Sequence, residues 1–292
     1  MAPALPGISV STEWLLDQRV GDVVVADVRW VPGGSVAEVF ERGHLPGAIS
    51  FDLDEDLARP AFDGPGRHPL PDPATFAEAM RAAGIGDDIP VVAYDDVGGW
   101  VAARLWWMLH VTDHPVALLD LPSLDAWATA GGTLEDGPVA PQPVSVFTER
   151  PWPADRLADA LQVRAALVTG SATVVDARAG ERYRGDLEPI DPVAGHIPGS
   201  VNAPWAGNRE DDGEGELLSP ALMRARYETL GVHQGDRAIA SCGSGVTAAF
   251  AVFAMELAGL PGAKLYEGSW SDWTHDRSRP IATGPEPGRM PD

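Results

Sequence analysis

The sequence predicts an α/β protein of two tandem domains, each a mainly parallel sheet flanked by helices on both faces. Three observations predict this fold class. The chain has 292 residues, roughly two domains at about 150 residues per domain. It contains an internal repeat, and short β-branched runs alternate with helical segments along each copy. Strands that are covered on both faces appear in a sequence as continuous apolar runs, as they do here.

Composition and charge narrow the class of protein. Hydrophobic residues make up 45% of the chain and charged residues 22%, so the chain has enough apolar surface to fold. The net charge of −22 repels nucleic acids and anionic membranes, so neither is an expected partner. The N-terminus lacks the features of a signal peptide, and the apolar stretch around residues 248–260 is too short to span a bilayer. We therefore expect a cytoplasmic protein.

Four segments recur in the same order, at offsets of 146 to 152 residues. A series of collinear matches with so little drift indicates a duplication. The pairs are VVVADVR (23–29) with ATVVDAR (172–178), GHLPGAISF (43–51) with GHIPGSVNA (195–203), VVAYD (91–95) with AIASC (238–242), and LLDLPSLDAW (118–127) with KLYEGSWSDW (264–273).

A proline-rich stretch marks the boundary between the copies. It has no helical periodicity and is typical of an extended linker. We expect a first domain at 1–137, a linker at 138–153 and a second domain at 154–292.

Apolar β-branched runs predict the strands, and longer segments of helical pattern predict the helices. For one helix, Ser219 is a suitable N-cap and Pro220 a suitable first residue. The expected strands are 23–28, 91–94, 116–119, 172–175, 238–241 and 264–266, and the expected helices are 75–83, 102–110, 220–230 and 247–258.

Comparing the two copies separates features of the fold from candidates for function. His44 and His196 occupy the same turn in both copies, so they are expected to serve the fold. The third repeated segment differs, because one copy has Asp95 where the other has Cys242, the single cysteine of the chain. One cysteine cannot form an intrachain disulfide.

The loop that begins at Cys242 suits a nucleophilic thiol. Its sequence, Cys-Gly-Ser-Gly-Val-Thr, joins an expected strand to an expected helix. The amides of Gly243, Gly245, Val246 and Thr247 could form an anion-holding nest, and the positive end of the helix dipole adds to it. Such surroundings favour the thiolate, the reactive form of cysteine. The alternative is a small buried core residue, a common environment for a free cysteine.

Several kinds of cysteine chemistry do not fit the residues. A cysteine phosphatase needs an arginine six positions after the nucleophile, where this chain has Ala248. A papain-like base has no local signature, a metal site lacks paired ligand spacing, and a redox pair would need a second cysteine. A lone thiolate that forms a covalent adduct and passes it on remains, and this chemistry needs no cofactor or metal.

The chain resembles the tandem rhodanese-domain sulfurtransferases over nearly its full length. The resemblance is carried by the loop from Cys242 to Thr247 and by five further motifs: GHIPG (195–199), VVDARAGERYRG (174–185), GRHPLP (66–71), YEGSWSDW (266–273) and SFDLDED (50–56). It implies that the second domain is catalytic and the first an inactive copy. It also implies a ping-pong cycle through a Cys242 persulfide, with a small anionic sulfur donor and a thiol, cyanide or thioredoxin-like acceptor.

The resemblance also implies roles for individual residues. Ser244 and Asp54 match a proposed Cys-Ser-Asp relay, His68 matches a substrate-lining histidine, and Arg182 matches an arginine that holds the donor carboxylate. Family members that prefer thiosulfate carry basic residues directly after the cysteine, whereas the Gly-Ser-Gly form resembles the 3-mercaptopyruvate sulfurtransferases.

One departure from the family pattern leaves the identity of the donor open. A second arginine usually follows the Glu-Pro pair, but here the pair precedes Ile190 and Asp191. Arg184 or Arg67 could take its place, and an anionic donor needs such local cations in a protein of this charge. Arg178 mirrors Arg29 in the first copy and is expected to form a structural ion pair.

The alternatives to a mercaptopyruvate enzyme are a thiosulfate-specific rhodanese and a non-catalytic sulfur carrier or regulatory module. A phosphatase or arsenate reductase is disfavoured.

Overall fold

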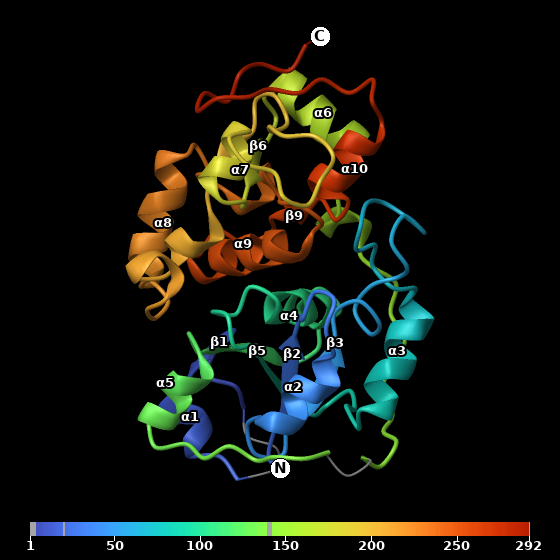
Figure 1. Ribbon diagram of the computed structural model, residues 1–292, viewed down its shortest axis with the longest axis vertical. Coiled ribbons are helices and arrows are strands. Elements are labelled where there is room, and N and C mark those ends of the chain that lie inside the picture. The colour runs from blue at the N-terminus through green and yellow to red at the C-terminus, as the bar shows by residue number, and fades with distance from the viewer. Residues whose placement is uncertain (1–3, 20, 139–141, 292) are drawn as a thin grey trace. The chain divides into compact units, whose positions relative to one another are not determined.

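The computed structural model describes residues 4–19, 21–138 and 142–291, which form two compact units (Figure 1). Unit 1 contains the chain up to Arg59 together with Pro71–Trp152, and unit 2 contains Pro60–Leu70 and the chain from Pro153 on. Of the expected linker, 139–141 lie outside the described residues. The stretch 142–152 has no helix or strand and belongs to unit 1.

Unit 1 is a five-stranded sheet in the order β1-β5-β4-β2-β3, with every neighbouring pair parallel. Helix α4 lies on one side of this sheet and α1, α2 and α5 on the other (Figure 1). The strands are β1 (Ser9–Ser11), β2 (Val24–Arg29), β3 (Ile49–Asp52), β4 (Val91–Tyr94) and β5 (Val116–Asp120), and the helices are α1 (Thr12–Leu16), α2 (Val36–Arg42), α3 (Pro73–Ala82), α4 (Ala102–His110) and α5 (Leu124–Thr129).

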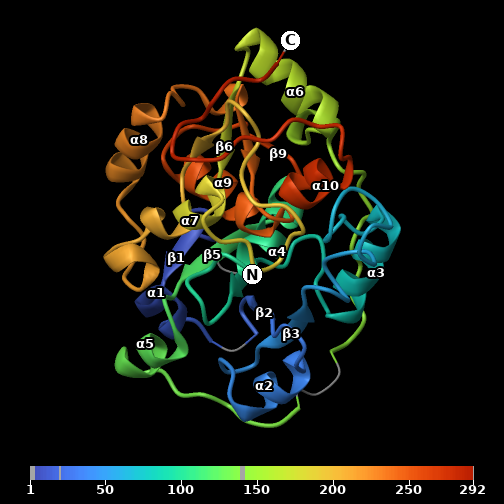
Figure 2. The same ribbon diagram turned by 45° about the horizontal axis from the view of Figure 1, so that its top comes forward.

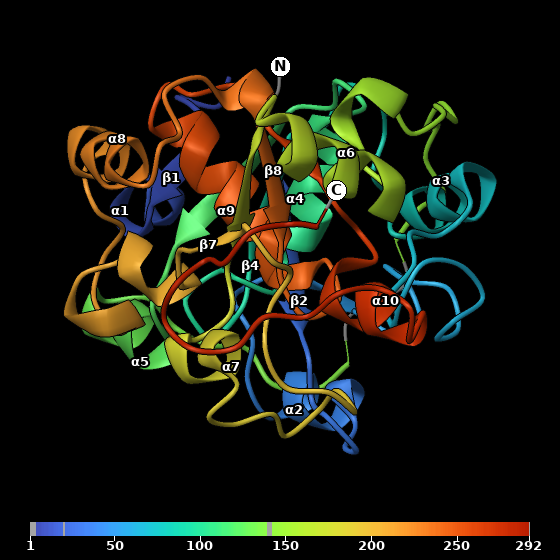
Figure 3. The same cartoon turned by 90° about the horizontal axis from the view of Figure 1, so that it is seen from above.

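Unit 2 is a parallel four-stranded sheet in the order β7-β6-β8-β9. Helices α6 and α10 lie on one side of β8 and α9 on the other (Figure 3). The strands are β6 (Thr173–Asp176), β7 (Val201–Asn202), β8 (Ala238–Ser241) and β9 (Lys264–Leu265), and the helices are α6 (Ala160–Thr169), α7 (Gly180–Arg184), α8 (Pro220–Thr229), α9 (Val246–Leu257) and α10 (Ser269–His275). Short 3₁₀ turns occur at Ala154–Arg156, Trp205–Asn208, Asp211–Gly213 and Gly235–Arg237.

The two sheets confirm the duplication. Strands β9, β8, β6 and β7 follow the same order as β5, β4, β2 and β3, and Leu157 pairs in parallel with Leu265 at the place where β1 lies in unit 1. All six expected strands are present with ends shifted by at most one residue, and the four expected helices by at most two. Ser219 caps α8 through the Leu222 amide, as predicted.

The repeated histidines serve the fold in the same way in both units. His44 and His196 are buried, and each Nδ1 lies within 2.9 Å of a backbone carbonyl, of Phe40 and Tyr183 respectively. Each imidazole also stacks on the ring of that same residue. This confirms the expectation that they belong to turn structure.

Residues 60–70 do not pack where the sequence division placed them. The expected first domain includes this segment, but it packs in unit 2, beside α10 (Figure 2). Gly66 has a left-handed backbone (φ 75°) and lies against Gly268, where a side chain would not fit. The Arg67 amide donates to Ser271 Oγ, and the Leu70 amide donates to a Glu267 carboxylate oxygen at 2.8 Å. Long-range hydrogen bonds of this kind leave no local signal in the sequence.

None of the helices within the described residues is long and apolar enough to cross a membrane.

The loop after β4 shows how the fold accommodates an anion. The Asp95 side chain is buried and accepts hydrogen bonds from four backbone amides, those of Val97, Gly99, Val101 and Ala102, at 2.7 to 2.9 Å. Buried amides need an acceptor, and a carboxylate satisfies several at once. In unit 1, a side chain of the protein therefore fills the place where the other copy has a cysteine.

We expect Asp95→Ala to destabilise unit 1 strongly, because three buried amides and one partly buried amide lose their acceptor. The loss should be about 2–5 kcal/mol in the free energy of unfolding, measured by chemical denaturation. Asp96→Ala is the matched control, since its side chain is partly exposed and lies 3.9 Å from its nearest cation, Arg29. Equal stabilities of the two variants would contradict this account of the loop.

Candidate functional site

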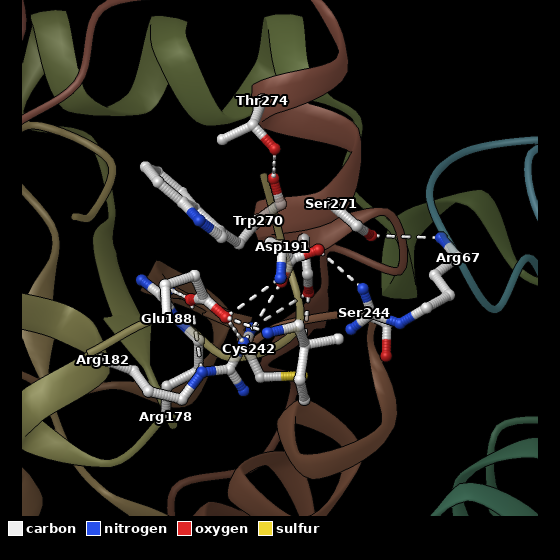
Figure 4. Close-up of polar contacts among 12 residues, drawn as sticks. Arg67, Arg178, Arg182, Glu188, Asp191, Cys242, Ser244, Trp270, Ser271 and Thr274 are labelled. Carbon is white, nitrogen blue, oxygen red and sulfur yellow. Dashed lines mark hydrogen bonds and ion pairs between the residues drawn. The ribbon is translucent and has the colours of Figure 1, made fainter. Parts of the chain in front are cut away.

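Cys242 follows β8 directly and is held by the first turn of α10 (Figure 4). Its amide donates to Ser269 Oγ at 2.9 Å, and its carbonyl accepts from the Trp270 amide at 3.0 Å. The next carbonyl, of Gly243, accepts from the Ser271 amide at 2.9 Å. The end of β8 is thus held by hydrogen bonds to a second element, the start of α10, which fixes the backbone at Cys242 and Gly243.

The sulfur of Cys242 is buried in polar surroundings. The residue is 1% exposed, and Sγ accepts the Gly245 amide at 3.2 Å and lies 3.9 Å from Ser269 Oγ. Gly245 has a left-handed backbone (φ 81°), and a Cβ there would collide with the Glu267 carbonyl. Only glycine can hold this amide against the sulfur.

The predicted amide cradle is present in part. Among the described residues, the Gly245 amide is the loop donor that contacts Sγ. Val246 and Thr247 are the first two residues of α9, where amides have no partner within the helix. Their position at the N-terminus of a twelve-residue helix keeps positive dipole ends close to the cysteine.

Arg178 is a buried structural arginine. Its guanidinium holds Asp176 through Nε and Nη2, at 3.1 and 2.7 Å, and donates to the Gly195 carbonyl at 2.8 Å. It also lies over the ring of Trp270, 4.8 Å from the centroid. Arg29 makes the same contacts with Asp27 and the Gly43 carbonyl in unit 1. The expected structural ion pair is confirmed.

Unit 2 places a carboxylate closer to this arginine than unit 1 does, since Asp96 in unit 1 lies 3.9 Å from Arg29 Nη1. Glu188 Oε2 lies 3.3 Å from Arg178 Nη1. Burial acts to raise the pKa of Glu188, but the hydrogen bond and charge of Arg182, with the amides of Asp191 and Ile190, outweigh it and hold the pKa below its ordinary value. Burial acts to lower the pKa of Arg178, but the neighbouring Asp176, Glu188 and Cys242 raise it overall. Glu188 and Arg178 are therefore charged at neutral pH.

Two further arginines share the carboxylate of Asp191. Arg182 Nη2 lies 2.6 Å from Glu188 Oε1 and 3.2 Å from Asp191 Oδ2, and Arg67 Nη1 lies 2.6 Å from Asp191 Oδ1. The Glu188 and Asp191 side chains are 3% and 2% exposed, whereas those of Arg182 and Arg67 are 16% and 23% exposed. The carboxylates thus lie behind the guanidiniums, which keep some access to solvent (Figure 4).

Both guanidiniums lie beside the cysteine loop. A Cβ built on Gly243 would be 3.4 Å from Arg67 Nη2 and 3.6 Å from Arg182 Nη1. Within the described part of the chain, neither of these two nitrogens has a hydrogen-bond acceptor. A guanidinium carries five N–H donors, so this pair can bind a further anion next to Cys242.

Ser244 and His68 form a buried pair. Ser244 Oγ lies 2.7 Å from His68 Nδ1, and both residues are 6% exposed. The two residues come from distant parts of the chain, the Cys242 loop and the segment 60–70. A hydroxyl and an imidazole at this distance can exchange a proton.

Two further predicted residues, Arg184 and Asp54, make contacts with residues outside the cysteine loop. The Arg184 side chain is 41% exposed and pairs with Asp186, which directs its guanidinium to a surface carboxylate. Asp54 belongs to unit 1, where its carboxylate accepts the Trp30 indole N–H at 3.2 Å. Its part in a relay stays a prediction.

Sequence reasoning missed three residues that organise the site. Ser269 positions Cys242 from a left-handed backbone (φ 51°), and Glu188 and Asp191 hold the arginines. Acidic loop residues have no periodicity that could have revealed them. The absence of an arginine after the Glu-Pro pair was the available signal, since an acidic residue stands there instead. The described residues contain no cluster of histidine, cysteine and carboxylate side chains suited to a metal ion.

Comparison with known proteins identifies the family. The rhodanese-like domain family matches residues 11–130 and 159–276. The "Probable 3-mercaptopyruvate sulfurtransferase" of Pseudomonas aeruginosa is 44% identical over 269 residues, 90% of this chain and 93% of that protein. The thiosulfate sulfurtransferase of Bos taurus is 36% identical over 281 residues, 91% of each chain.

Solved structures agree with these relatives. The crystal structure of SseA from Escherichia coli matches with a TM-score of 0.76 and 33% identity, covering 90% of this chain and 99% of that chain. The two domain matches coincide with the two copies found in the sequence. The chain therefore belongs to the rhodanese family of sulfurtransferases.

Proposed function

We propose that this protein transfers a sulfur atom from a small anionic donor, 3-mercaptopyruvate or thiosulfate, to a thiol, cyanide or thioredoxin-like acceptor through a Cys242 persulfide. The observation that carries the proposal is the convergence on one loop of a single thiol, an amide donor and two arginines with unused N–H groups. No other described residue of the chain is a cysteine. Both donor classes occur in the names of the relatives.

The first half of the reaction loads the sulfur. The Cys242 thiolate attacks the transferable sulfur of the donor, and an S–S bond forms. The bond between that sulfur and the rest of the donor breaks, with its electron pair leaving as sulfite from thiosulfate or as the pyruvate enolate from 3-mercaptopyruvate. Arg67 and Arg182 hold the anionic group of the donor through Nη2 and Nη1.

The second half unloads it. The outer sulfur of the persulfide is negatively charged and lies in the field of the Gly245 amide and the start of α9. A nucleophilic acceptor attacks this sulfur, the S–S bond breaks, and the Cys242 thiolate is restored. Cyanide gives thiocyanate, and a thiol gives a new persulfide.

The Ser244–His68 pair has a role for one donor only. The pyruvate enolate must gain a proton to leave as pyruvate, whereas sulfite leaves without one. Ser244 Oγ lies two residues from the thiol in sequence and 2.7 Å from an imidazole nitrogen that can resupply its proton. Asp54 is the proposed further member of this relay.

Cys242→Ser should abolish sulfur transfer from both donors, because a hydroxyl at this position is not ionised. The measurements are thiocyanate formation from thiosulfate and cyanide, and sulfide release from 3-mercaptopyruvate with a thiol. Intact-mass spectrometry of the wild type after donor alone should show the gain of one sulfur atom. Turnover by the serine variant would contradict the proposal, and a stable adduct without turnover would support the carrier alternative.

Arg182→Ala should raise the KM for either donor by about 10- to 100-fold, the value of a charged hydrogen bond to the substrate anion. Arg224→Ala is the matched control, because that arginine lies on the exposed face of α8 and pairs with Glu228. Thermal denaturation of both variants checks that unit 2 remains folded. A KM unchanged from the wild type would remove Arg182 from the binding of the donor.

Ser244→Ala should lower kcat for 3-mercaptopyruvate by about 100-fold, the usual contribution of a positioned proton donor, and should change kcat for thiosulfate much less. Thiosulfate is the internal control, since its leaving group needs no proton. Asp54→Asn tests the third member of the relay. A loss of kcat for 3-mercaptopyruvate that is larger than the loss for thiosulfate would support a role for Asp54, and equal losses for the two donors would exclude it. Equal losses with both donors in Ser244→Ala would show a structural role for the serine.

A further inference from the structure

We infer that Asp191 sets the charge of donor that this site accepts, by neutralising one of the two guanidiniums that face Cys242. The inference rests on the proposed function, and it names the class of donor within it: an anion that presents a single negative charge, as the carboxylate of 3-mercaptopyruvate does, rather than a dianion such as thiosulfate.

The first step is the geometry of the carboxylate. Asp191 places one oxygen on each arginine, 2.6 Å from Arg67 Nη1 and 3.2 Å from Arg182 Nη2. Its side chain is 2% exposed, so solvent screens it little. A carboxylate that bridges two guanidiniums in this way lies next to the same two groups whose remaining N–H donors lie beside the cysteine loop.

The second step is the balance of charge around the loop. The described side chains of this cluster form a closed set of ion pairs in which each cation has an anionic partner. The three guanidiniums are those of Arg67, Arg178 and Arg182, and the three carboxylates are those of Asp176, Glu188 and Asp191. The three guanidiniums are therefore already balanced by three carboxylates, not counting the Cys242 thiolate, before a donor arrives, in a protein whose net charge is −22.

The third step is the cost to the donor. The Coulomb energy of a donor in the field of Asp191 is proportional to the charge of the donor. The unfavourable energy is therefore twice as large for a dianion as for a monoanion. If Asp191 lowers kcat/KM for a monoanion by a given factor, it lowers kcat/KM for a dianion by the square of that factor. The unused N–H groups of Arg67 and Arg182 still supply directional hydrogen bonds, which a single carboxylate can satisfy.

The test changes the charge at position 191 and leaves the shape nearly unchanged. In Asp191→Asn, kcat/KM should rise about fivefold for 3-mercaptopyruvate and roughly 25-fold for thiosulfate, since a unit charge a few ångströms away in a partly exposed site changes a rate by about this amount per unit of donor charge. Asp191→Glu keeps the charge and should retain the wild-type ratio between the two donors.

Asp186→Asn is the matched control. Asp186 lies in the same loop, but its carboxylate is 60% exposed and pairs with Arg184. Its removal should leave kcat/KM unchanged for both donors. Equal changes for the two donors in Asp191→Asn would overturn the inference. So would a changed donor ratio in Asp191→Glu, because it would show that Asp191 acts only by positioning Arg67.

A second readout does not depend on sulfur transfer. Cys242 is the single cysteine, so its alkylation can be followed by intact mass with iodoacetate, an anion, and iodoacetamide, a neutral analogue. Asp191→Asn should raise the iodoacetate rate about fivefold relative to the iodoacetamide rate. An unchanged ratio refutes the inference. If the ratio changes but no donor is turned over, the charge role stands and the proposed function fails.

Discussion

The site depends on the requirement that a buried guanidinium be fully paired. Arg178 is 3% exposed, and removing such a cation from water costs several kcal/mol unless carboxylates and carbonyls surround it. Its partners come from four places: Asp176 at the end of β6, Glu188 in the loop after α7, the Gly195 carbonyl in the GHIPG turn, and the ring of Trp270 in α10. Satisfying this one side chain fixes the elements that surround Cys242.

Unit 1 contains an equivalent buried and paired arginine but has no cysteine at the end of the neighbouring strand. Arg29 is paired with Asp27 and with the Gly43 carbonyl, and Tyr94 OH also donates to Asp27. The loop that follows is closed by the Asp95 carboxylate, which uses four amides internally. In unit 2, the shorter loop leaves a thiol and one amide in its place. In both units, the loop after the strand presents amides that can hold an anion. In unit 1 the Asp95 carboxylate binds these amides, whereas in unit 2 Cys242 stands at the equivalent position.

Much of the fold could be predicted because the repeat and the apolar runs are properties of local sequence. The strands β1, β3 and β7 were not predicted. Ser9–Ser11 and Val201–Asn202 have only three and two residues, and Ile49–Asp52 is as long as β4 but contains Ser50 and Asp52 instead of a continuous apolar run. The cysteine loop was found through the difference between copies. The placement of 60–70 was not found, because it depends on hydrogen bonds from Arg67 and Leu70 to residues about 200 positions away.

The same limit applies to the charges of the site. A sequence shows how many arginines stand near a motif, and it suggested a cationic site for an anionic donor. It does not show how many of those cations are already neutralised. Glu188 and Asp191 answer that question in the structure, because their oxygens lie within 3.3 Å of Arg178, Arg182 and Arg67. What remains for a donor is a set of oriented N–H groups with little net charge. Recognition in such a site relies on the direction of hydrogen bonds more than on long-range attraction, which suits a protein whose overall field repels anions.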